Sequence, residues 1–175
     1  NGGSGSSSIE QNMLYPEIPS LETSFGRLAY RVDQAGLKDR LKAILWHQGE
    51  SNSRERYKLY MDQFDVLLND WKRVYTGIEK VYLFQLHPGC GGEYQSQLRK
   101  VQCQIADRYD MVNIMSTTGV TGHDGCHFSY EGYCEFAGRI FPLVSRDFYG
   151  AKYQRPITPP KLIGARHQKR NEIVL

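Results

Sequence analysis

Apolar residues follow two patterns along this chain, short continuous runs and longer stretches with helical spacing. The short runs cover residues 42–46, 81–86 and 111–115, and each has the length of a buried β-strand. Between the first two runs, apolar side chains recur at steps of three and four residues, which predicts one face of an amphipathic helix: Tyr57, Tyr60, Met61, Phe64, Leu67, Leu68, Trp71 and Val74.

The boundaries of this helix are predicted from capping signals. Asn52 with Glu55 forms a plausible capping pair at its start, and Gly77 is placed to end it. Ser129 is placed to cap a further helix close to the end of the domain. The helical spacing continues in two more sets of residues, Leu98, Val101, Ile105 and Tyr109, and then Tyr133, Ala137, Ile140, Phe141 and Val144.

The alternation of strands and helices predicts an α/β fold. Strand, helix, strand, helix, strand and helix follow one another, which is typical of a mostly parallel sheet covered by helices on both faces, a three-layer α/β/α architecture. We expect residues 1–150 to form this domain. Residues 151–175 contain prolines that prevent a continuing helix, followed by two short strand-like runs around a basic turn, and they read as a linker and the start of another unit.

Composition and charge exclude some classes of protein. The chain has 175 residues, of which 40% are hydrophobic, so a globular domain with a sizeable core is expected. Its longest apolar runs are far shorter than the roughly 20 residues of a membrane-spanning helix, so no membrane partner is expected. The net charge of +3 is small, and the basic residues are dispersed except at residues 166–170, which argues against nucleic acid as a partner.

Polar residues follow each predicted strand. Residues 46–50 read Trp-His-Gln-Gly-Glu at the end of the first strand, His87 follows the second, and the loop of residues 123–128 follows the third. In a parallel sheet with right-handed crossovers, the carboxyl ends of the strands open on the same edge, where α/β proteins bind ligands. These loops are therefore expected to meet in one cleft.

The pair of Asp124 and His127 has the spacing of two members of a hydrolytic triad. The Asp124 carboxylate can accept from Nδ1 of His127, which leaves Nε2 to take a proton from a hydroxyl nucleophile. We expect His127 to act as general base and then general acid, with Asp124 orienting it. The alternatives are an Asp-Gly turn residue and a histidine at a helix start.

Other residues near the strand ends are candidates for oxyanion stabilisation or substrate binding. Gln48 can donate an amide N–H to an oxyanion, or it can bridge loops instead. Gly5 can offer a backbone N–H, because a glycine allows close approach. For Glu50 a structural role at the helix start is favoured over a catalytic one. Gly49 belongs to the same block, and His47 and His87 are expected to line the substrate pocket.

The same region also contains candidate metal ligands and two of the four cysteines. His123, Asp124, Cys126 and His127 crowd one loop, but no further pair follows at zinc-finger spacing, so no metal site is expected. Four cysteines allow several pairings. A bridge between Cys90 and Cys126 and two free thiols both remain open, while Cys103 and Cys134 are expected to be small buried residues within helices.

The motifs resemble the SGNH hydrolases, and within them the family of sialate O-acetylesterases and carbohydrate acetylesterases. The block at 46–50 is similar to the family's Trp-x-Gln-Gly-Glu block, and residues 124–127 match its Asp-x-x-His block. Residues 5–10 look like an earlier Gly-Gly-Thr-Ser-Ile block, with Ser6 standing where the second glycine is usual. The likeness extends over about residues 1–150.

The resemblance implies a flavodoxin-like fold and a serine esterase that removes O-acetyl groups from a carbohydrate, either sialic acid or a polysaccharide. It implies no cofactor, favours a periplasmic or secreted location, and suggests that residues 151–175 begin a β-rich domain. The family's nucleophile block, Gly-Gln-Ser-Asn, does not occur in these residues. We therefore expect the serine to come from an upstream segment or a second chain, and this chain alone to be inactive.

Two other functions remain open. A non-catalytic glycan-binding module would keep the fold and the cleft without a nucleophile. A metal-dependent phosphoester hydrolase would use the acidic and histidine residues as ligands.

Overall fold

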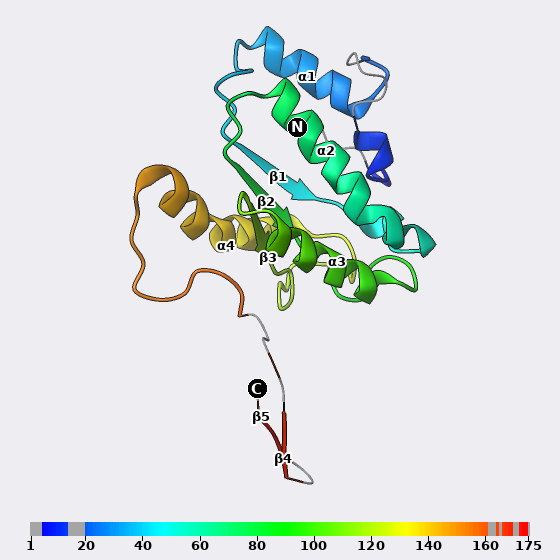
Figure 1. The fold of residues 1–175 in the computed structure, drawn as a ribbon, viewed down its shortest axis with the longest axis vertical. Helices are drawn as coiled ribbons and strands as arrows, with labels where there is room; N and C mark the ends of the chain where they lie inside the picture. Colours follow the sequence, from blue (N-terminus) through cyan, green and yellow to red (C-terminus); the bar gives the residue numbers. More distant parts are fainter. Residues whose placement is uncertain (1–4, 14–19, 161–163, 165, 170–171, 175) are drawn as a thin grey trace.

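The computed structural model describes residues 5–13, 20–160, 164, 166–169 and 172–174 of the chain. Figure 1 shows the succession of helices and strands. In chain order, the elements are η1 (Glu10–Asn12), α1 (Ser24–Gln34), β1 (Ala43–His47), η2 (Glu50–Asn52), η3 (Glu55–Leu59), α2 (Tyr60–Val74), β2 (Lys80–Phe84), α3 (Gln95–Arg108), β3 (Val112–Met115), α4 (Tyr130–Tyr149), β4 (Arg166–Lys169) and β5 (Glu172–Val174).

The three strands predicted from the apolar runs form one parallel sheet in the order β1-β2-β3. Ala43 pairs with Lys80 at the start of the sheet, and Val81 pairs with Val112. Each strand is joined to the next by a helix, α2 and then α3. The carboxyl ends of all three strands therefore lie at the same edge, as the sequence predicts.

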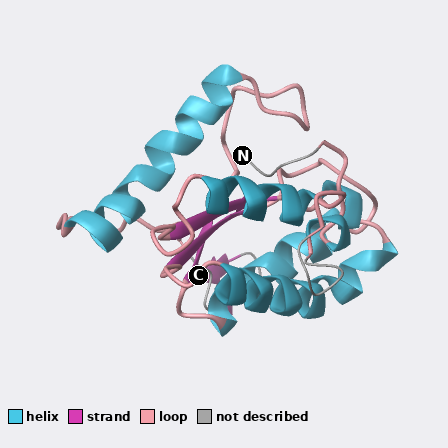
Figure 2. Ribbon diagram, turned by 90° about the horizontal axis from the view of Figure 1, so that it is seen from above, coloured by secondary structure: helices cyan, strands magenta, loops and turns pink. Residues whose placement is uncertain are grey.

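Helices cover both faces of this sheet (Figure 2). On one face, α1, α2 and α3 share a core with Val81 and Leu83 of β2. On the other face, α4 packs on Tyr82 and Phe84, whose side chains point the opposite way because successive strand residues alternate. The predicted three-layer α/β/α fold is confirmed.

Helix α1 was not among the predicted elements. It begins after Thr23, whose side chain accepts a hydrogen bond from the backbone N–H of Gly26. Its buried residues Phe25, Ala29 and Val32 recur at steps of four and three, and this spacing is a helical signal that the sequence does contain. The helix packs against the same hydrophobic core as α2 and α3.

The capping pair proposed for Asn52 and Glu55 was wrong. Helix α2 begins at Tyr60, after the 3-10 segment η3, and the Asn52 side chain accepts hydrogen bonds from the backbone N–H of Ile9 and from Gln48 instead. The backbone N–H of Ile9, 43 residues away in sequence, is hydrogen-bonded to the oxygen that the local spacing predicts as a helix cap. By contrast, Ser129 does cap α4, accepting from the backbone N–H of Gly132.

The last described residues include a short antiparallel pair, β4 and β5. That residues 151–175 begin a β-rich domain stays a prediction. Among the described residues, no helix is long and apolar enough to cross a membrane.

Candidate active site

The loops at the carboxyl ends of the strands border a cavity of about 970 Å³. This cavity also extends along β1 towards α1 and α2, because residues of all three elements line it. The candidate residues that line it are Gly5, His47, Gln48, Glu50 and His127. Gly49, His87 and Asp124 are not among the residues that line it.

Asp124 holds His127 by its backbone and by its ring. The Asp124 Oδ1 atom accepts from the backbone N–H groups of Cys126 at 2.9 Å and His127 at 2.8 Å, and Oδ2 lies 3.2 Å from His127 Nδ1. These hydrogen bonds, led by that of Cys126, lower the pKa of Asp124 to about 2, so the carboxylate is charged at neutral pH.

The ring of His127 is open to solvent and to the cavity. Its side chain is 84% exposed, and no hydrogen-bond partner of Nε2 occurs among the residues that the structure describes. This is the orientation that a general base needs, with one nitrogen fixed by a carboxylate and the other facing the reactants.

A disulfide joins the His127 loop to the loop that follows β2. Cys90 and Cys126 are bonded, with their Cα atoms 4.7 Å apart, and Cys90 is buried. The sequence left open a bridge or two free thiols, and the structure contains the bridge. Cys103 is partly buried, but Cys134 is exposed, so its expected burial was wrong.

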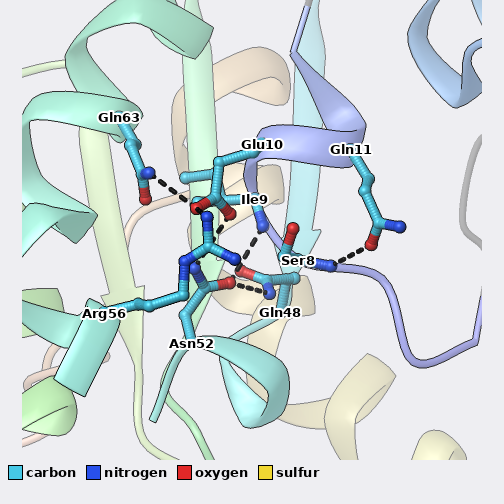
Figure 3. Close-up of polar contacts among 8 residues, drawn as sticks. All are labelled: Ser8, Ile9, Glu10, Gln11, Gln48, Asn52, Arg56 and Gln63. Atoms are coloured by element: carbon cyan, nitrogen blue, oxygen red, sulfur yellow. Dashed lines mark hydrogen bonds and ion pairs between the residues drawn. The ribbon is translucent and has the colours of Figure 1, made fainter. Parts of the chain in front are cut away.

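Gln48 is buried, and its side-chain Nε2 donates two hydrogen bonds, whereas its Oε1 is buried without a described partner (Figure 3). Nε2 donates to the backbone oxygen of Ser7 at 3.0 Å and to Oδ1 of Asn52 at 2.7 Å. Its backbone oxygen accepts from the hydroxyl of Tyr60 and the amide of Gln102. Gln48 therefore bridges loops, and donation to an oxyanion would require Nε2 to release one of these two acceptors.

Asn52 and Glu10 complete this network, and the sequence analysis missed both roles. Asn52 donates to Glu10 at 3.1 Å, Gln63 donates to the other Glu10 oxygen at 2.8 Å, and Arg56 forms an ion pair with it (Figure 3). The network fixes η1 and the residues before it against η2. No local signal marks these partners, because they are about 40 to 50 residues apart in sequence.

The segment fixed in this way brings Gly5 and Ser6 to the cavity wall. Ser6 has a φ of 58°, in the left-handed region that favours glycine. This agrees with the resemblance, in which a glycine usually stands at this position. The backbone oxygen of Ser6 accepts from the hydroxyl of Ser51 at 3.1 Å, which ties the segment to η2.

Gly49 and Glu50 play different parts in the turn after β1. Gly49 has a φ of 158°, and a Cβ there would lie 3.2 Å from side-chain atoms of both Gln102 and Leu98. A larger residue here would strain the backbone and push the side chains of α3 aside, so glycine is favoured in this turn. The Glu50 carboxylate lines the cavity and forms no hydrogen bond with the described residues, so the N–H groups at the start of η2 are not its partners.

His47 and His87 are both buried enough to favour the neutral ring. His47 lies among the rings of Phe84, Phe128 and Phe136, at centroid distances of 5.5 to 6.0 Å, and its Nε2 is buried without a described partner. Burial lowers the pKa of His47. Burial, and then the proximity of His123 with its ring centroid 4.2 Å away, lower the pKa of His87.

The described residues contain no group of three or more His, Cys, Asp or Glu side chains arranged to hold a metal ion. Cys126, which the sequence places among the candidate ligands, is instead half of the disulfide.

Comparison with known protein families agrees with this geometry. The family model described as carbohydrate esterase, sialic acid-specific acetylesterase, matches residues 3–144, which include every candidate residue named above. No curated protein matches the chain. The match covers most of the chain, and the chain therefore belongs to the sialic acid-specific acetylesterase family of carbohydrate esterases.

Proposed function

We propose that this carbohydrate acetylesterase-like domain carries the histidine and aspartate of a serine esterase, and that polypeptide outside this chain supplies the serine. The substrate is an acetylated carbohydrate, a sialic acid or a polysaccharide. The observation that carries the proposal is the His127 ring, bonded to Asp124 through Nδ1 and lining the cavity with Nε2 unoccupied by any described residue.

The reaction begins when the serine hydroxyl attacks the acetyl carbonyl carbon while His127 Nε2 takes the hydroxyl proton. The tetrahedral intermediate collapses, and His127 returns the proton to the sugar oxygen as it leaves. Water, deprotonated by the same ring, then attacks the acetyl-serine carbonyl carbon, and the ring gives that proton to the serine oxygen as acetate is released. Asp124 stays ionised and stabilises the protonated ring throughout. The sequence of steps needs no cofactor.

The negative oxygen of the intermediate needs donors at the same end of the cavity. The backbone N–H of Gly5 and the amide of Gln48 are the proposed donors, and one donor typically contributes about 3 kcal/mol. Glu50 and His47 line the cavity, Gly49 packs against α3, and His87 contacts the rings of His123 and Phe128 in the loop after β3.

The disulfide beside the site fits an oxidising compartment, which is consistent with a periplasmic or secreted enzyme.

A non-catalytic glycan-binding module is the second candidate. It is favoured by one observation: no serine hydroxyl among the described residues forms a hydrogen bond with His127. Ser6, Ser7, Ser24 and Ser51 line the cavity, but none lies in a nucleophile elbow.

The test is hydrolysis of 4-nitrophenyl acetate by the chain alone and by the chain with a segment bearing the Gly-Gln-Ser-Asn block. We expect no enzymatic hydrolysis from the chain alone and clear hydrolysis from the mixture. His127→Ala or Asp124→Asn should then reduce kcat/KM by roughly a thousandfold or more.

Asp110→Asn is the matched control, because Asp110 is exposed and precedes β3, at the edge of the sheet opposite the site loops, and it should leave the rate unchanged. Full activity from the chain alone would contradict the external serine. Activity that survives His127→Ala would contradict the mechanism, and saturable glycan binding without hydrolysis in the mixture would favour the binding module.

A further inference from the structure

The cavity beside His127 carries one cationic side chain that has no partner among the described residues. Of the described residues that line this cavity, Arg54 is the only lysine or arginine, and Glu50 is the only aspartate or glutamate. Arg54 is exposed, and its guanidinium forms no ion pair or hydrogen bond with any residue that the structure describes. A positive charge without a counter-ion at the wall of a cavity is available to a negatively charged ligand.

Other arginines of the chain have partners within the protein. Five of them form ion pairs with carboxylates, namely Arg56, Arg73, Arg108, Arg139 and Arg146. Arg99 donates to the backbone oxygen of Leu86 and to the hydroxyl of Thr118. Arg54 differs from them because its donors face the cavity unused. The planar fork of N–H groups in a guanidinium matches the two oxygens of a carboxylate.

The backbone at Arg54 is held in place by the residue before it. Ser53 is fully buried. Its Oγ donates to the backbone oxygen of Glu50 at 2.6 Å and accepts from the backbone N–H of Gly92 at 2.5 Å. Its backbone oxygen accepts from the N–H of Tyr94 at 2.9 Å. These hydrogen bonds join the turn after β1 to the loop after β2, so the exposed Arg54 side chain extends from a fixed backbone.

Two glycines in the loop after β2 make room for this side chain. A Cβ on Gly92 would lie 2.6 Å from Cγ of Arg54, and a Cβ on Gly91 would lie 2.1 Å from Oγ of Ser53. The stem of Arg54 therefore passes directly over the backbone of Gly92. Both glycines line the cavity together with Arg54.

The same loop connects Arg54 with the proposed catalytic histidine. Cys90 comes directly before the two glycines, and the disulfide joins it to Cys126, which precedes His127. Arg54, Cys126 and His127 all line the one cavity, whose volume of about 970 Å³ is that of a small-molecule site. A substrate with its ester at His127 therefore occupies the same cavity as the Arg54 guanidinium.

An aromatic ring also lines this cavity. Tyr133, in the first turn of α4, leaves 54% of its surface exposed. Its ring lies edge-on to Phe128 and Phe136, at centroid distances of 6.1 and 5.8 Å, and these contacts restrict its orientation. Tyrosine presents an apolar ring face together with a polar hydroxyl, which suits the C–H and hydroxyl groups of a sugar.

We infer that Arg54 and Tyr133 form a subsite for an acidic sugar, in which Arg54 binds the carboxylate and Tyr133 packs against the sugar ring. The inference rests on the proposed function for the acetyl ester. The subsite itself is argued from the unpaired guanidinium, its fixed backbone and the cavity it shares with His127. It narrows the substrate from carbohydrates in general to sugars that carry a carboxylate, either a sialic acid or a uronic acid.

N-acetylneuraminic acid and its methyl ester are the probe and its matched control, because they differ in the charge of one carboxyl group. Binding to the whole chain is measured by the shifts of the backbone amide NMR signals of Gly91 and Gly92 on titration. We expect saturable binding of the acid and binding of the methyl ester that is weaker by at least about tenfold. Tighter binding of D-galacturonic acid than of N-acetylneuraminic acid would assign the same subsite to a uronic acid.

Substitutions of Arg54 test the carboxylate contact. Arg54→Gln should bind the acid no more tightly than the wild type binds the methyl ester, and Arg54→Lys, which keeps the charge without the planar fork, should bind it with intermediate affinity. Arg40→Gln is the matched control, because Arg40 is exposed, precedes β1 at the opposite edge of the sheet and does not line the cavity. The urea midpoint of each variant checks that it is folded.

Substitution of Tyr133 tests the ring contact separately. Tyr133→Ala should weaken binding of the acid and of the methyl ester to the same extent, because both ligands contain the sugar ring. Tyr130→Ala is the matched control, because Tyr130 lies in the same turn of α4, is 80% exposed and does not line the cavity. If Tyr133→Ala bound both ligands like the wild type, the assignment of Tyr133 would be wrong.

The subsite and the proposed function fail in different ways. The inference is overturned if the wild type binds neither acid, binds the methyl ester as tightly as the acid, or loses no affinity on Arg54→Gln relative to Arg40→Gln. None of these measurements involves the serine, so hydrolysis of 4-nitrophenyl acetate by the complemented protein would leave the esterase in place beside such a result. Binding that depends on Arg54, without hydrolysis, would keep the subsite and count against the esterase.

Discussion

Both hydrogens of the Gln48 side-chain amide are donated within the protein, although Gln48 lies at the wall of the proposed active site. One hydrogen fixes the backbone of Ser7, and the other fixes Asn52, which in turn holds Ile9 and Glu10. A single side chain thus supports the segment that brings Gly5 to the cavity. Loss of this side chain would remove a donor from the Ser7 oxygen, leave Asn52 Oδ1 with the donor from Ile9 alone, and leave space in a buried site.

We predict that Gln48→Ala lowers the free energy of unfolding by about 2 kcal/mol, through the two lost hydrogen bonds and the space left behind. Urea denaturation measures this change. Gln104→Ala, at an exposed position of α3, is the control and should have little effect. If Gln48→Ala reduced only turnover of the serine-complemented protein and left the unfolding midpoint unchanged, its role would be in catalysis alone.

At the scale of elements, the loop between β3 and α4 is held by several independent restraints. His123 and Phe128 form an antiparallel bridge, Asp124 accepts two backbone hydrogen bonds, and Gly125 takes a φ of 106° that favours glycine. The disulfide then ties Cys126 to the loop after β2. Together these restraints give the His127 ring one orientation although it is exposed to solvent.

The disulfide should contribute most of the stability of this tethered pair of loops. Because Cys90 and Cys126 are 36 residues apart, the lost entropy of the unfolded chain corresponds to roughly 3 to 4 kcal/mol. The double variant Cys90→Ser with Cys126→Ser should lose about this much in urea denaturation without reductant. Addition of reductant should lower the midpoint of the wild type similarly.

Cys134→Ser provides the comparison, because Cys134 is an exposed free thiol, and it should unfold like the wild type. Equal midpoints for the double variant and the wild type would show that the bridge does not stabilise the domain.

At the scale of the whole molecule, His47, which is partly buried, and His87, which is buried, lie where β1, β2 and the loop after β3 meet. The pKa of His47 and that of His87 are both lowered, mainly by burial, so the folded state favours their neutral forms. The unfolded chain takes up protons on these rings near the ordinary histidine value of about 6.5. The stability they contribute is therefore fully present above that pH and is lost as the pH falls below it.

We predict that the urea midpoint decreases between pH 7.5 and pH 5. His47→Phe should reduce this dependence, because a phenyl ring fits among Phe84, Phe128 and Phe136 and takes up no proton. His127→Ala should keep the dependence, because that ring is exposed. A midpoint that is the same at both pH values would contradict a role for these rings in acid sensitivity.

Local patterns in the sequence were enough to predict the framework of the domain. The three strands, the helices between them and the Ser129 cap depend on neighbours within a few residues, and so does the spacing of Asp124 and His127. Helix α1 was missed although the helical spacing of Phe25, Ala29 and Val32 is present in the sequence. The role of Asn52 was predicted wrongly because its side-chain oxygen accepts a hydrogen bond from the backbone N–H of Ile9, which is distant in sequence.

The sequence by itself determined the α/β framework, the edge at which the site lies and the pair formed by Asp124 and His127. Only the tertiary structure decided which cysteines pair, how the Gln48 amide is shared, and on which side of β1 no described strand pairs. The physical reason is the separation in sequence of the residues that interact. Periodicity and capping act within a few residues, whereas disulfides, buried hydrogen bonds and strand neighbours join residues that only the folded chain brings together.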